Sequence, residues 1–519
     1  MFKKNVSYGL IFLALSGLHS GCSSTKEFTR RPEPKTVPAS PLSVLTKDGG
    51  LYRVKNYRFA DSLFWAAGAL EKDGKIRPFE GRLALGDIDY VQAKNNWGAG
   101  KILLATGAAV IFSAVAISYL NKGSDGFSVQ EVHGTYYPPS SGGGDGWYSC
   151  PFIYSYDGGQ YHLESETFAG AVFKGAERAS FDKLERLRPV KGQYRLKLAN
   201  ESEETEYVNE IKLLVVDAPP GVKVIPDAKG SLHTLSRPVY PFRCVDGENK
   251  DVLSAVREKD DRWWESELAA KDLSRDEKLR DGLVLEFEKP REAKAAKLVV
   301  SGVNTALGIF AFEQLFQLKG ENQLRWYQKL EGDPAERGKL IAWMRREGML
   351  HVKVWKEGEW VEQTALPDVG PGISKDQVAV LDLSQIPSGT VKLKLESATD
   401  LWRINQVYLD YSPDLPVEVA EIEPAGAVDE RGNDVASSLR RNDDRYYVTI
   451  KGQYAHLTFE EVPARAGRQR HYAVKAKGYY HQWFEAEGAE ETALLERVLT
   501  EPLFGSRTFM PLWKARKGQ

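Results

Sequence analysis

The chain has 519 residues, of which 42% are hydrophobic, so it is long enough for about three or four domains with cores of ordinary size. Its 70 basic and 72 acidic residues nearly balance, and the formal net charge of −2 gives no support for a nucleic-acid partner.

The first residues have the layout of an export signal. Lys3 and Lys4 precede a mostly apolar stretch of small residues, Val6 to Leu18, which is too short to span a bilayer. The stretch ends in residues that resemble a lipoprotein signal, namely Leu18, Ser20, Gly21 and Cys22. The resemblance implies that residues 1–21 are removed and that Cys22 becomes the acylated first residue.

Two neighbours of the cysteine qualify this interpretation. His19 occupies a position where lipoprotein signals usually have Leu, so an ordinary cleaved signal with an unlipidated Cys22 is the alternative. Ser23, and not Asp, follows the cysteine, which in related lipoproteins favours the outer membrane over the inner one. We therefore expect a protein of the bacterial envelope that is anchored to a membrane.

The next segments predict a spacer and a small domain. Residues 22–45 are polar and rich in Ser, Pro and Lys, as in a flexible tether that holds a folded domain away from a membrane. Residues 46–97 contain short apolar runs separated by Gly and Asp, which predicts a small β-rich module.

An uncharged apolar run follows this module. Within residues 99–121, Ile102 to Leu120 is about as long as a transmembrane helix and has small residues at four-residue spacing, as in helices that pack closely inside a bilayer. A helix buried within the protein or between its copies is the alternative. Residues 122–147, rich in Gly and Pro, predict a linker.

Beyond Tyr148 the sequence predicts antiparallel β-sandwich domains in tandem, with few helices. Apolar and polar residues alternate repeatedly, as at 194–198, 391–395 and 472–476, which puts one face of a strand on a core and the other in water. We expect four regions, which are a β-sandwich region at 148–300, a β domain with a helical insertion at 301–415, a C-terminal β region at 416–485 and a helical tail at 486–519. Asp333 and Pro334 mark the start of one helix in the insertion.

A series of short motifs in this part resembles large β-rich bacterial envelope lipoproteins that have no assigned activity. The resemblance covers most of the chain after Tyr148 and is carried by the order of the motifs, among them Cys150 to Tyr154, Asp157 to Gly159, Glu177-Arg178, Asn200-Glu201 and Asp217. It implies sandwich architecture and a lipoprotein setting, and it brings no catalytic residues with it.

The sequence offers few candidates for chemistry. It has no phosphate-binding glycine loop, zinc-spaced cysteines or nucleophile elbow, and it implies no cofactor. His162, Glu164 and Glu166 alternate along one expected strand and could together accept a cation or a polar ligand, although a solvated strand face is the plainer explanation. Cys150 and Cys244 are a candidate disulfide in an oxidising compartment.

Tryptophans are the last candidates, since their rings could form a stacking platform for sugars, whereas burial in cores is the alternative; they are Trp263, Trp264, Trp355, Trp360 and Trp402. Taken together, the sequence predicts a membrane-anchored envelope lipoprotein that has a structural role or binds a ligand or partner, such as a protein or glycan, and that carries no evident catalytic constellation. An oligomeric envelope assembly that uses the helix at 102–120, or a protein that binds or acts on glycans, is the alternative.

Overall fold

The computed structural model describes residues 37–60, 63–73, 75–94, 101–105 and 150–518, apart from 203, 444, 483, 485 and 487. The chain divides into two compact units, the smaller with residues up to 94 and 104–131, and the larger with residues 95–103 and 132–519. The fold is mainly β, with several antiparallel sheets and few helices, as the sequence predicts.

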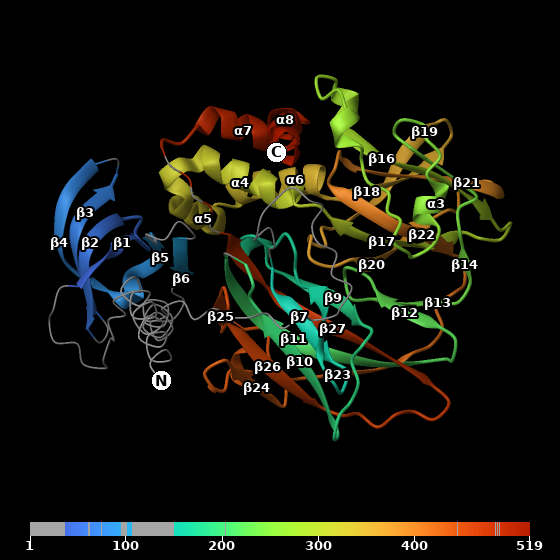
Figure 1. Cartoon of the computed structure of the whole chain (residues 1–519), viewed down its shortest axis with the longest axis horizontal. Coiled ribbons are helices and arrows are strands. Elements are labelled where there is room, and N and C mark those ends of the chain that lie inside the picture. Colours follow the sequence, from blue (N-terminus) through green and yellow to red (C-terminus); the bar gives the residue numbers. More distant parts are fainter. Residues whose placement is uncertain are drawn as a thin grey trace, which may run out of the picture. The chain divides into compact units, whose positions relative to one another are not determined.

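One six-stranded sheet is built by the described residues 37–105 (Figure 1, in blue). The strand order β4-β3-β2-β1-β5-β6 is a meander in which β5 returns to pair with β1. Its core includes Val44, Val54, Phe64 and Ile88, which are fully buried. The strands are β1 (Val37–Thr46), β2 (Leu51–Ala60), β3 (Leu63–Lys72), β4 (Lys75–Ala84), β5 (Ile88–Lys94) and β6 (Lys101–Ala105).

Two expectations for this region need correction. Residues 37–45, expected at the end of a flexible tether, form most of β1, which lies between two other strands. Residues 101–105, expected at the start of an apolar helix, form β6 next to β5 instead. The remainder of that run, 106–120, and the linker 122–147 lie outside the described residues, as does Cys22. Every helix that the structure describes is too short or too polar to cross a membrane.

The larger unit contains two β-sandwich-like bodies, which we call the first and second sandwich. The first combines a five-stranded sheet in the order β24-β26-β10-β7-β8 with a sheet in the order β23-β11-β27-β9, to which β25 adds. Its strands come from both ends of the unit: β7 (Phe152–Tyr156), β8 (Tyr161–Glu166), β9 (Arg178–Leu184), β10 (Gln193–Ala199), β11 (Glu204–Ala218), and then β23 (Glu418–Ile422), β24 (Gly426–Asp429), β25 (Tyr447–Ile450), β26 (Tyr454–Glu460) and β27 (Gln469–Gln482).

The second sandwich lies between these two groups of strands in the sequence. Its sheets have the orders β15-β16-β21-β18-β19 and β14-β22-β17-β20. The strands are β14 (Pro238–Val239), β15 (Arg243–Asp246), β16 (Arg280–Lys289), β17 (Ala295–Asn304), β18 (Leu350–Lys356), β19 (Glu359–Leu366), β20 (Lys375–Asp382), β21 (Gly389–Ala398) and β22 (Trp402–Asp410).

The two sandwiches have the same topology. Each strand of the order β24-β26-β10-β7-β8 corresponds to the strand at the same place in β15-β16-β21-β18-β19, and the four-stranded sheets correspond in the same way. The sequence repeats at one corresponding pair of loops, where Val245-Asp246, Asp251-Val252, Arg257 and Asp260-Asp261-Arg262 recur at the same spacing as Val428-Asp429, Asp434-Val435, Arg440 and Asp443-Asp444-Arg445. The larger unit is therefore an internal duplication.

The duplicated halves are exchanged between the sandwiches. The first repeat runs from β7 to β17 and ends in helices, and the second runs from β18 to β27 and also ends in helices. The first sandwich takes β7 to β11 from the first repeat and β23 to β27 from the second. The second sandwich takes β18 to β22 from the second repeat and β14 to β17 from the first. An expected boundary at residue 300 would cut β17, and strands at 418–482 complete the first sandwich instead of forming a region of their own.

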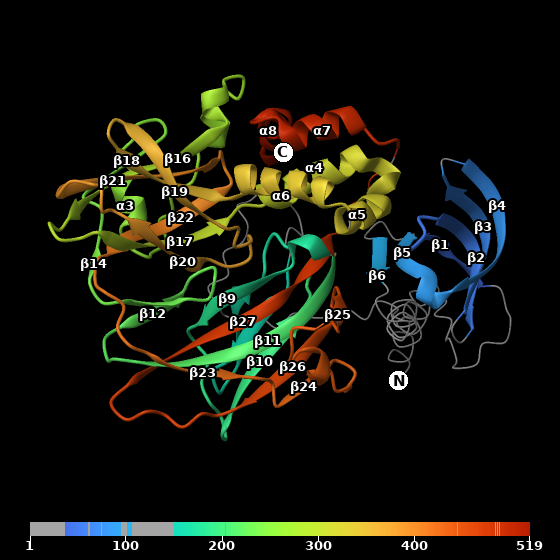
Figure 2. The same cartoon turned by 180° about the vertical axis from the view of Figure 1, so that it is seen from behind.

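A hairpin with no counterpart in the second repeat joins the sandwiches. It consists of β12 (Lys223–Pro226) and β13 (Leu232–Leu235), and it lies between the two bodies in both views (Figures 1 and 2). Val224 packs against β11 and Ala473 of the first sandwich. Ile225 and Leu235 pack against Val299 of the second. Successive residues of a strand point to opposite sides, which is how one hairpin contacts both sandwiches.

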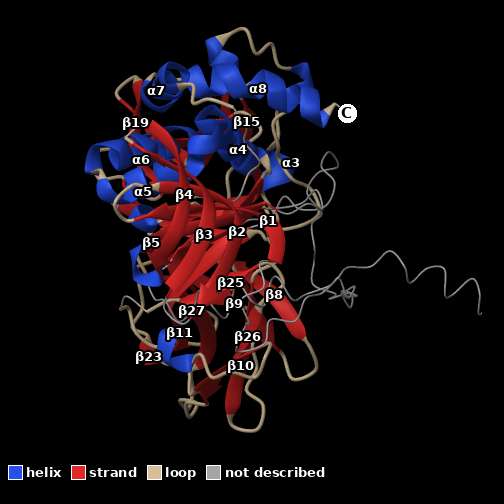
Figure 3. Cartoon of the chain, turned by 90° about the vertical axis from the view of Figure 1, so that its left-hand side faces the viewer, coloured by secondary structure: helices blue, strands red, loops and turns tan. Residues whose placement is uncertain are grey.

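The longer helices of the larger unit gather at one end of its sheets (Figure 3). Asp333 caps the helix at 334–348 by accepting hydrogen bonds from the backbone N–H groups of Ala335 and Glu336, with Pro334 in the first turn, as the sequence predicts. The helices are the short α3 (Leu253–Val256), then α4 (Leu307–Lys319), α5 (Gln323–Gly332) and α6 (Pro334–Gly348) after β17, and α7 (Thr492–Thr500) and α8 (Phe504–Lys517) after β27.

Candidate functional site

The three residues expected to share a strand face lie on β8, but a β-bulge separates them. Ile153 pairs with Ser165 and Tyr154 pairs with Leu163, so Glu164 is an extra residue. A bulge shifts the alternation by one residue, which places His162 and Glu166 on opposite faces of the sheet. The expected common face for a cation or polar ligand is therefore wrong.

Each of these side chains is also occupied by the protein itself. His162 bonds Asp157 through Nε2 at 2.6 Å and Arg186 through Nδ1 at 2.8 Å. Glu164 accepts from the hydroxyl of Ser155 and from the Arg186 backbone N–H. Among the described residues, no group of three His, Cys, Asp or Glu side chains is arranged to hold a metal ion.

Glu166 is fully buried where β8 meets the loop after β19. Its Oε2 accepts from the Gly372 backbone N–H at 2.6 Å. Burial raises the pKa of Glu166 well above its ordinary value, so this carboxyl favours its neutral form. Glu166 leaves no room for a side chain at either glycine of this loop. A Cβ would lie 2.1 Å from its carboxyl group at Gly370 and 2.8 Å from it at Gly372. The contact ties the two sandwiches together, and its role is structural.

The other sequence candidates are also structural. Cys150 and Cys244 are both buried and are not joined by a disulfide, which corrects that expectation; one precedes β7 of the first sandwich and the other lies on β15 of the second. Trp264 and Trp402 are buried core residues. The rings of Trp355 and Trp360 meet at 66°, so they do not form the flat surface on which a sugar ring would stack.

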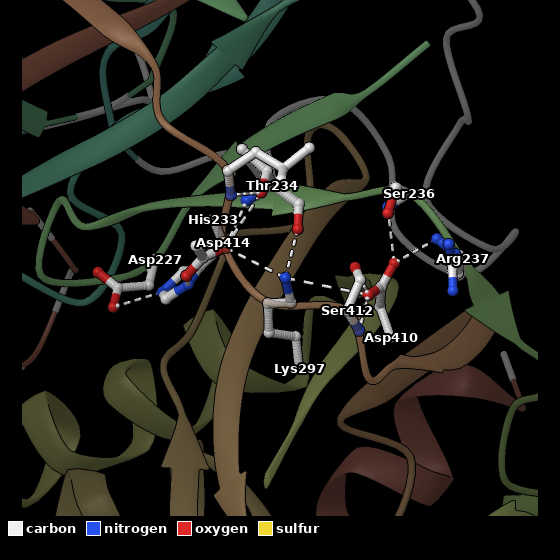
Figure 4. A network of polar contacts seen from close by, with 10 residues as sticks. Asp227, His233, Thr234, Ser236, Arg237, Lys297, Asp410, Ser412 and Asp414 are labelled. Carbon is white, nitrogen blue, oxygen red and sulfur yellow. Dashed lines mark hydrogen bonds and ion pairs between the residues drawn. The ribbon is translucent and has the colours of Figure 1, made fainter. Parts of the chain in front are cut away.

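A partly buried polar network fastens the hairpin to the second sandwich (Figure 4). The Lys297 ammonium group donates to the Thr234 carbonyl oxygen and to Asp414, 3.1 Å away, and lies 3.9 Å from Asp410. His233 lies between Asp414 and Asp227, at 3.1 and 3.3 Å. Lys297 and His233 are each bonded to these partners, so the network joins β13, β17 and the segment after β22. We call it the hairpin latch.

An open groove of about 560 Å³ beside this hairpin is the strongest candidate for a binding site. It has the size of an ordinary ligand site and lies at a junction between domains, where such sites are common. The edge strand β9, the start of β12 and the first residues of β27 form its walls, which are lined by Lys183, Leu184, Glu185, Arg188, Gly221, Val222, Lys223, Gln469, Arg470, His471 and Tyr472.

Positive charge exceeds negative charge in this lining. Lys183 pairs with Glu185 at 2.7 Å, and Glu185 is the only carboxylate among the lining residues. Arg470 forms two hydrogen bonds to Asp217, at 2.9 and 2.8 Å. Lys223 pairs with Asp376 at 2.7 Å. Burial favours the neutral form of Asp376, but its lysine partners lower the pKa below the ordinary value, so this pair is ionised and occupied.

Arg188 is the cation that the groove leaves available. In the described part of the chain its guanidinium group bonds only carbonyl oxygens, those of Glu185 at 3.1 Å and Leu187 at 2.7 Å. These contacts fix the side chain without neutralising it, and the residue is exposed. A guanidinium held in this way is suited to a carboxylate or phosphate group, to which it can donate two parallel hydrogen bonds.

His471 contributes an acceptor to the same groove. Burial, with the nearby charge of Lys183, lowers the pKa of His471 below its ordinary value, so the imidazole is neutral at pH 7. The ring bonds the Val222 carbonyl, whereas its Nε2 is buried and has no partner among the described residues. The proton on Nδ1 is inferred from this bond, and it leaves Nε2 as an acceptor for a hydroxyl group.

No family model matches this chain, and no curated protein matches it significantly. The site therefore has to be judged from its geometry alone. Sequence reasoning missed it because its residues come from three separate segments, none of which carries a motif. The one available signal was the pair of polar residues Arg470-His471 at the start of an alternating strand.

Proposed function

We propose that this protein is an envelope lipoprotein, anchored through an acylated Cys22, whose larger unit binds an acidic glycan segment in the groove beside β12. The observation that carries the proposal is the combination of two groups in one groove, Arg188 and the acceptor nitrogen of His471. Among the described residues, no carboxylate pairs with Arg188 and nothing donates to this nitrogen. Cys22 lies outside the described residues, and the anchor rests on the resemblance of its surroundings to a lipoprotein signal.

An acidic sugar supplies both kinds of partner. Its carboxylate or phosphate group accepts from Arg188, and its hydroxyl groups donate to His471. A simple inorganic anion would leave His471 without a donor, and a neutral sugar would leave Arg188 without a counter-charge. The open, mostly polar lining also suits a polymer that passes along the groove, since such a ligand need not be enclosed.

A binding measurement with two oligosaccharides tests the proposal. We expect the purified protein to bind an oligogalacturonate, which carries a carboxylate on each sugar, and not a neutral maltooligosaccharide of equal length. Arg188→Ala should weaken binding about 10- to 100-fold, because a hydrogen bond to a charged group contributes about 1.5–3 kcal/mol. His471→Phe should weaken it by a smaller factor, since it removes a neutral bond.

Arg275→Ala is the matched control. Arg275 is exposed and pairs with Glu277 on a loop of the second sandwich, so its removal should leave binding unchanged. Binding should also fall as salt is raised, because exposed charges are screened at higher ionic strength. Equal binding of the acidic and neutral oligosaccharides, or equal loss in the Arg188 and Arg275 variants, would rule the groove out as the site.

A further inference from the structure

A second cavity, distinct from the groove, lies where the helices meet the ends of both sandwiches. Its volume is about 90 Å³, several times the ~10–15 Å³ that a single water needs on the same measure. The wall is largely apolar, and its larger buried members are Leu307, Phe312, Trp343, Leu401 and Phe509. Water gains few partners against such walls, so an apolar occupant is favoured over solvent.

Methionines are concentrated around this cavity. Met344 and Met349, at the end of α6, and Met510, in α8, all line it, and the chain has only four methionines in total. The thioether side chain is unbranched and flexible, so a wall made of methionines can adjust to ligands of different shape. This concentration is expected of an adaptable binding cavity more than of a tightly packed core.

Glycines keep the cavity open. A Cβ at Gly348 would have no atom within 4 Å, and one at Gly308 would meet its nearest atom at 3.8 Å. Gly308 is the second residue of α4 and Gly348 the last residue of α6. A larger side chain at either position would narrow the space beside it.

Two buried hydrogen-bond donors of the lining have no partner among the described residues. They are Nε1 of Trp343, whose side chain is 4% exposed, and Nε of Arg178. A Cβ at Gly505 would lie 3.0 Å from the Trp343 nitrogen, so any larger residue at this position would crowd the indole N–H. A buried donor without an acceptor is costly, and an acceptor atom on a ligand would remove that cost.

The charged side chains of the wall already have partners within the protein. Glu347 accepts from Arg346 at 2.9 Å and from the Ser506 hydroxyl at 2.8 Å. Arg178 donates to the carbonyl oxygens of Ala169 and Asp368 and lies near the Asp368 carboxyl group. A ligand that carried a net charge would add an unmatched charge to a low-dielectric wall, so a neutral ligand fits better.

We infer that this cavity binds a neutral, mostly apolar small molecule with one hydrogen-bond-accepting oxygen, which accepts from the Trp343 indole N–H. The inference concerns a site separate from the groove and does not depend on the function proposed for it. The alternative is that the cavity is a packing defect that takes up no ligand.

Three probes of similar size test the inference by the shift that each causes in the thermal unfolding midpoint of the full-length protein. Acetophenone has an aromatic ring and a carbonyl oxygen, isopropylbenzene has the same shape without the acceptor, and benzoate carries a charge. We expect a saturable rise in the midpoint with acetophenone, a smaller rise with isopropylbenzene and none with benzoate, since ligands that bind only the folded state stabilise it. No shift with any probe, or equal shifts with acetophenone and isopropylbenzene, would overturn the inference.

Two variants locate the effect. Trp343→Phe removes the donor and keeps an aromatic ring, so acetophenone should bind about three- to tenfold more weakly and lose its advantage over isopropylbenzene, which should itself be little affected. Ala311→Leu fills the cavity from α4 and should abolish the shift with every probe. Ala342→Leu, at an exposed position of α6, is the control and should bind as the wild type does. Unchanged probe binding in the Ala311 variant would show that the probes bind elsewhere.

Discussion

Asn209 and Asn405 occupy the same place in the two sandwiches, and each is the extra residue of a β-bulge. Val208 pairs with Gly478 while Glu210 pairs with Lys477, which leaves Asn209 over. In the second sandwich Ile404 pairs with Gly302 while Gln406 pairs with Ser301, which leaves Asn405 over. Both bulges therefore lie opposite a glycine, on corresponding strands.

The two asparagines also hold corresponding loops. Asn405 donates to the carbonyl oxygens of Asp260 and Arg262, at 2.6 and 2.7 Å. Asn209 accepts from the backbone N–H of Asp443, at 3.0 Å, and donates to Asn442. Since Asp443 corresponds to Asp260 in the repeat, the same bulge fixes the same loop in both bodies.

Replacing either asparagine with alanine should destabilise the protein by about 1–3 kcal/mol, because part-buried backbone groups of the loop lose their partner. Asn405→Ala should cost more, since it leaves two carbonyl oxygens unpaired. Urea unfolding of the purified protein measures the effect. Asn433→Ala, which removes only an exposed side-chain bond to Asp429, is the control and should change stability by about 0.5 kcal/mol or less.

The glycines opposite the bulges should differ in their tolerance of alanine. A Cβ at Gly478 would lie 2.3 Å from the Tyr207 carbonyl oxygen, whereas one at Gly302 would meet its nearest atom, the Arg403 carbonyl oxygen, at 3.1 Å. We expect Gly478→Ala to cost about 3 kcal/mol and Gly302→Ala about 1 kcal/mol, as overpacking does.

Gly338→Ala should stabilise the protein, whereas the same substitution at Gly478 or Gly302 should destabilise it. Gly338 lies in an exposed part of α6, where a Cβ would have no neighbour within 4 Å, so alanine should stabilise the helix by about 0.5–1 kcal/mol. Chemical denaturation of the three variants gives the order. A larger loss at Gly302 than at Gly478 would contradict the geometry.

Removal of the Lys297 ammonium group should release the hairpin latch. Lys297→Met keeps the apolar stem but leaves the Thr234 carbonyl oxygen and Asp414 without the ammonium donor. Asp410 keeps its bonds from the Ser236 and Arg237 backbone N–H groups, so the expected cost is that of lost charge-assisted hydrogen bonds, about 1.5–3 kcal/mol. Lys392→Met removes a surface lysine that lies 3.4 Å from Glu286 and should cost about 1 kcal/mol or less. Equal losses of the unfolding free energy in the two variants would show that the network contributes no more than a surface ion pair.

Glu206 should make the protein less stable as the pH rises. Burial, with the adjacent Glu204, raises the pKa of Glu206 well above that of an unfolded chain, which is about 4.3. Above that pH the folded state holds a proton that the unfolded state releases, so the unfolding free energy falls with increasing pH, by up to about 1.4 kcal/mol per unit.

Glu206→Gln removes this proton and keeps the shape, including the hydroxyl bond from Thr449. The variant should therefore show a flatter stability profile between pH 4 and 7 than the wild type. Glu460→Gln, at an exposed position of β26, should leave the profile unchanged. Parallel profiles for the wild type and Glu206→Gln would contradict the prediction.

The lipid anchor can be tested by metabolic labelling. A labelled fatty acid should be incorporated into the wild-type protein and not into Cys22→Ala, because the acyl groups are attached through this cysteine and its amino group. Cys244→Ala controls for unspecific acylation of thiols and should label normally. Equal labelling of the wild type and Cys22→Ala would leave an ordinary cleaved signal as the explanation.

Local features of the fold could be predicted from the sequence. The alternation at 194–198, 391–395 and 472–476 lies within β10, β21 and β27, and Asp333 caps α6. These elements depend on neighbours in the sequence, whose periodicity is visible in a single chain.

Features that depend on distant residues could not be predicted. The bulge at Glu164, which undid the expected common face, arises from the pairing of β8 with β7 and leaves no trace in the alternation. The groove requires β9, β12 and β27 together. The duplication did leave a signal, in the repeat of Asp260-Asp261-Arg262 as Asp443-Asp444-Arg445, but the strands around it share only their pattern.

Because the two repeats exchange strands, the two sandwiches are completed at different times as the chain is synthesised. The second sandwich is complete once β22 has been made, whereas β11, a 15-residue strand that is buried almost throughout, has to wait for β23 and β27. During that interval an apolar strand with open edges is available to pair with other chains, which is how aggregation begins. A truncation before β27 would therefore not simply remove one sandwich. It would leave the apolar strand β11 without its partner β27, and the shortened protein would stay prone to aggregation.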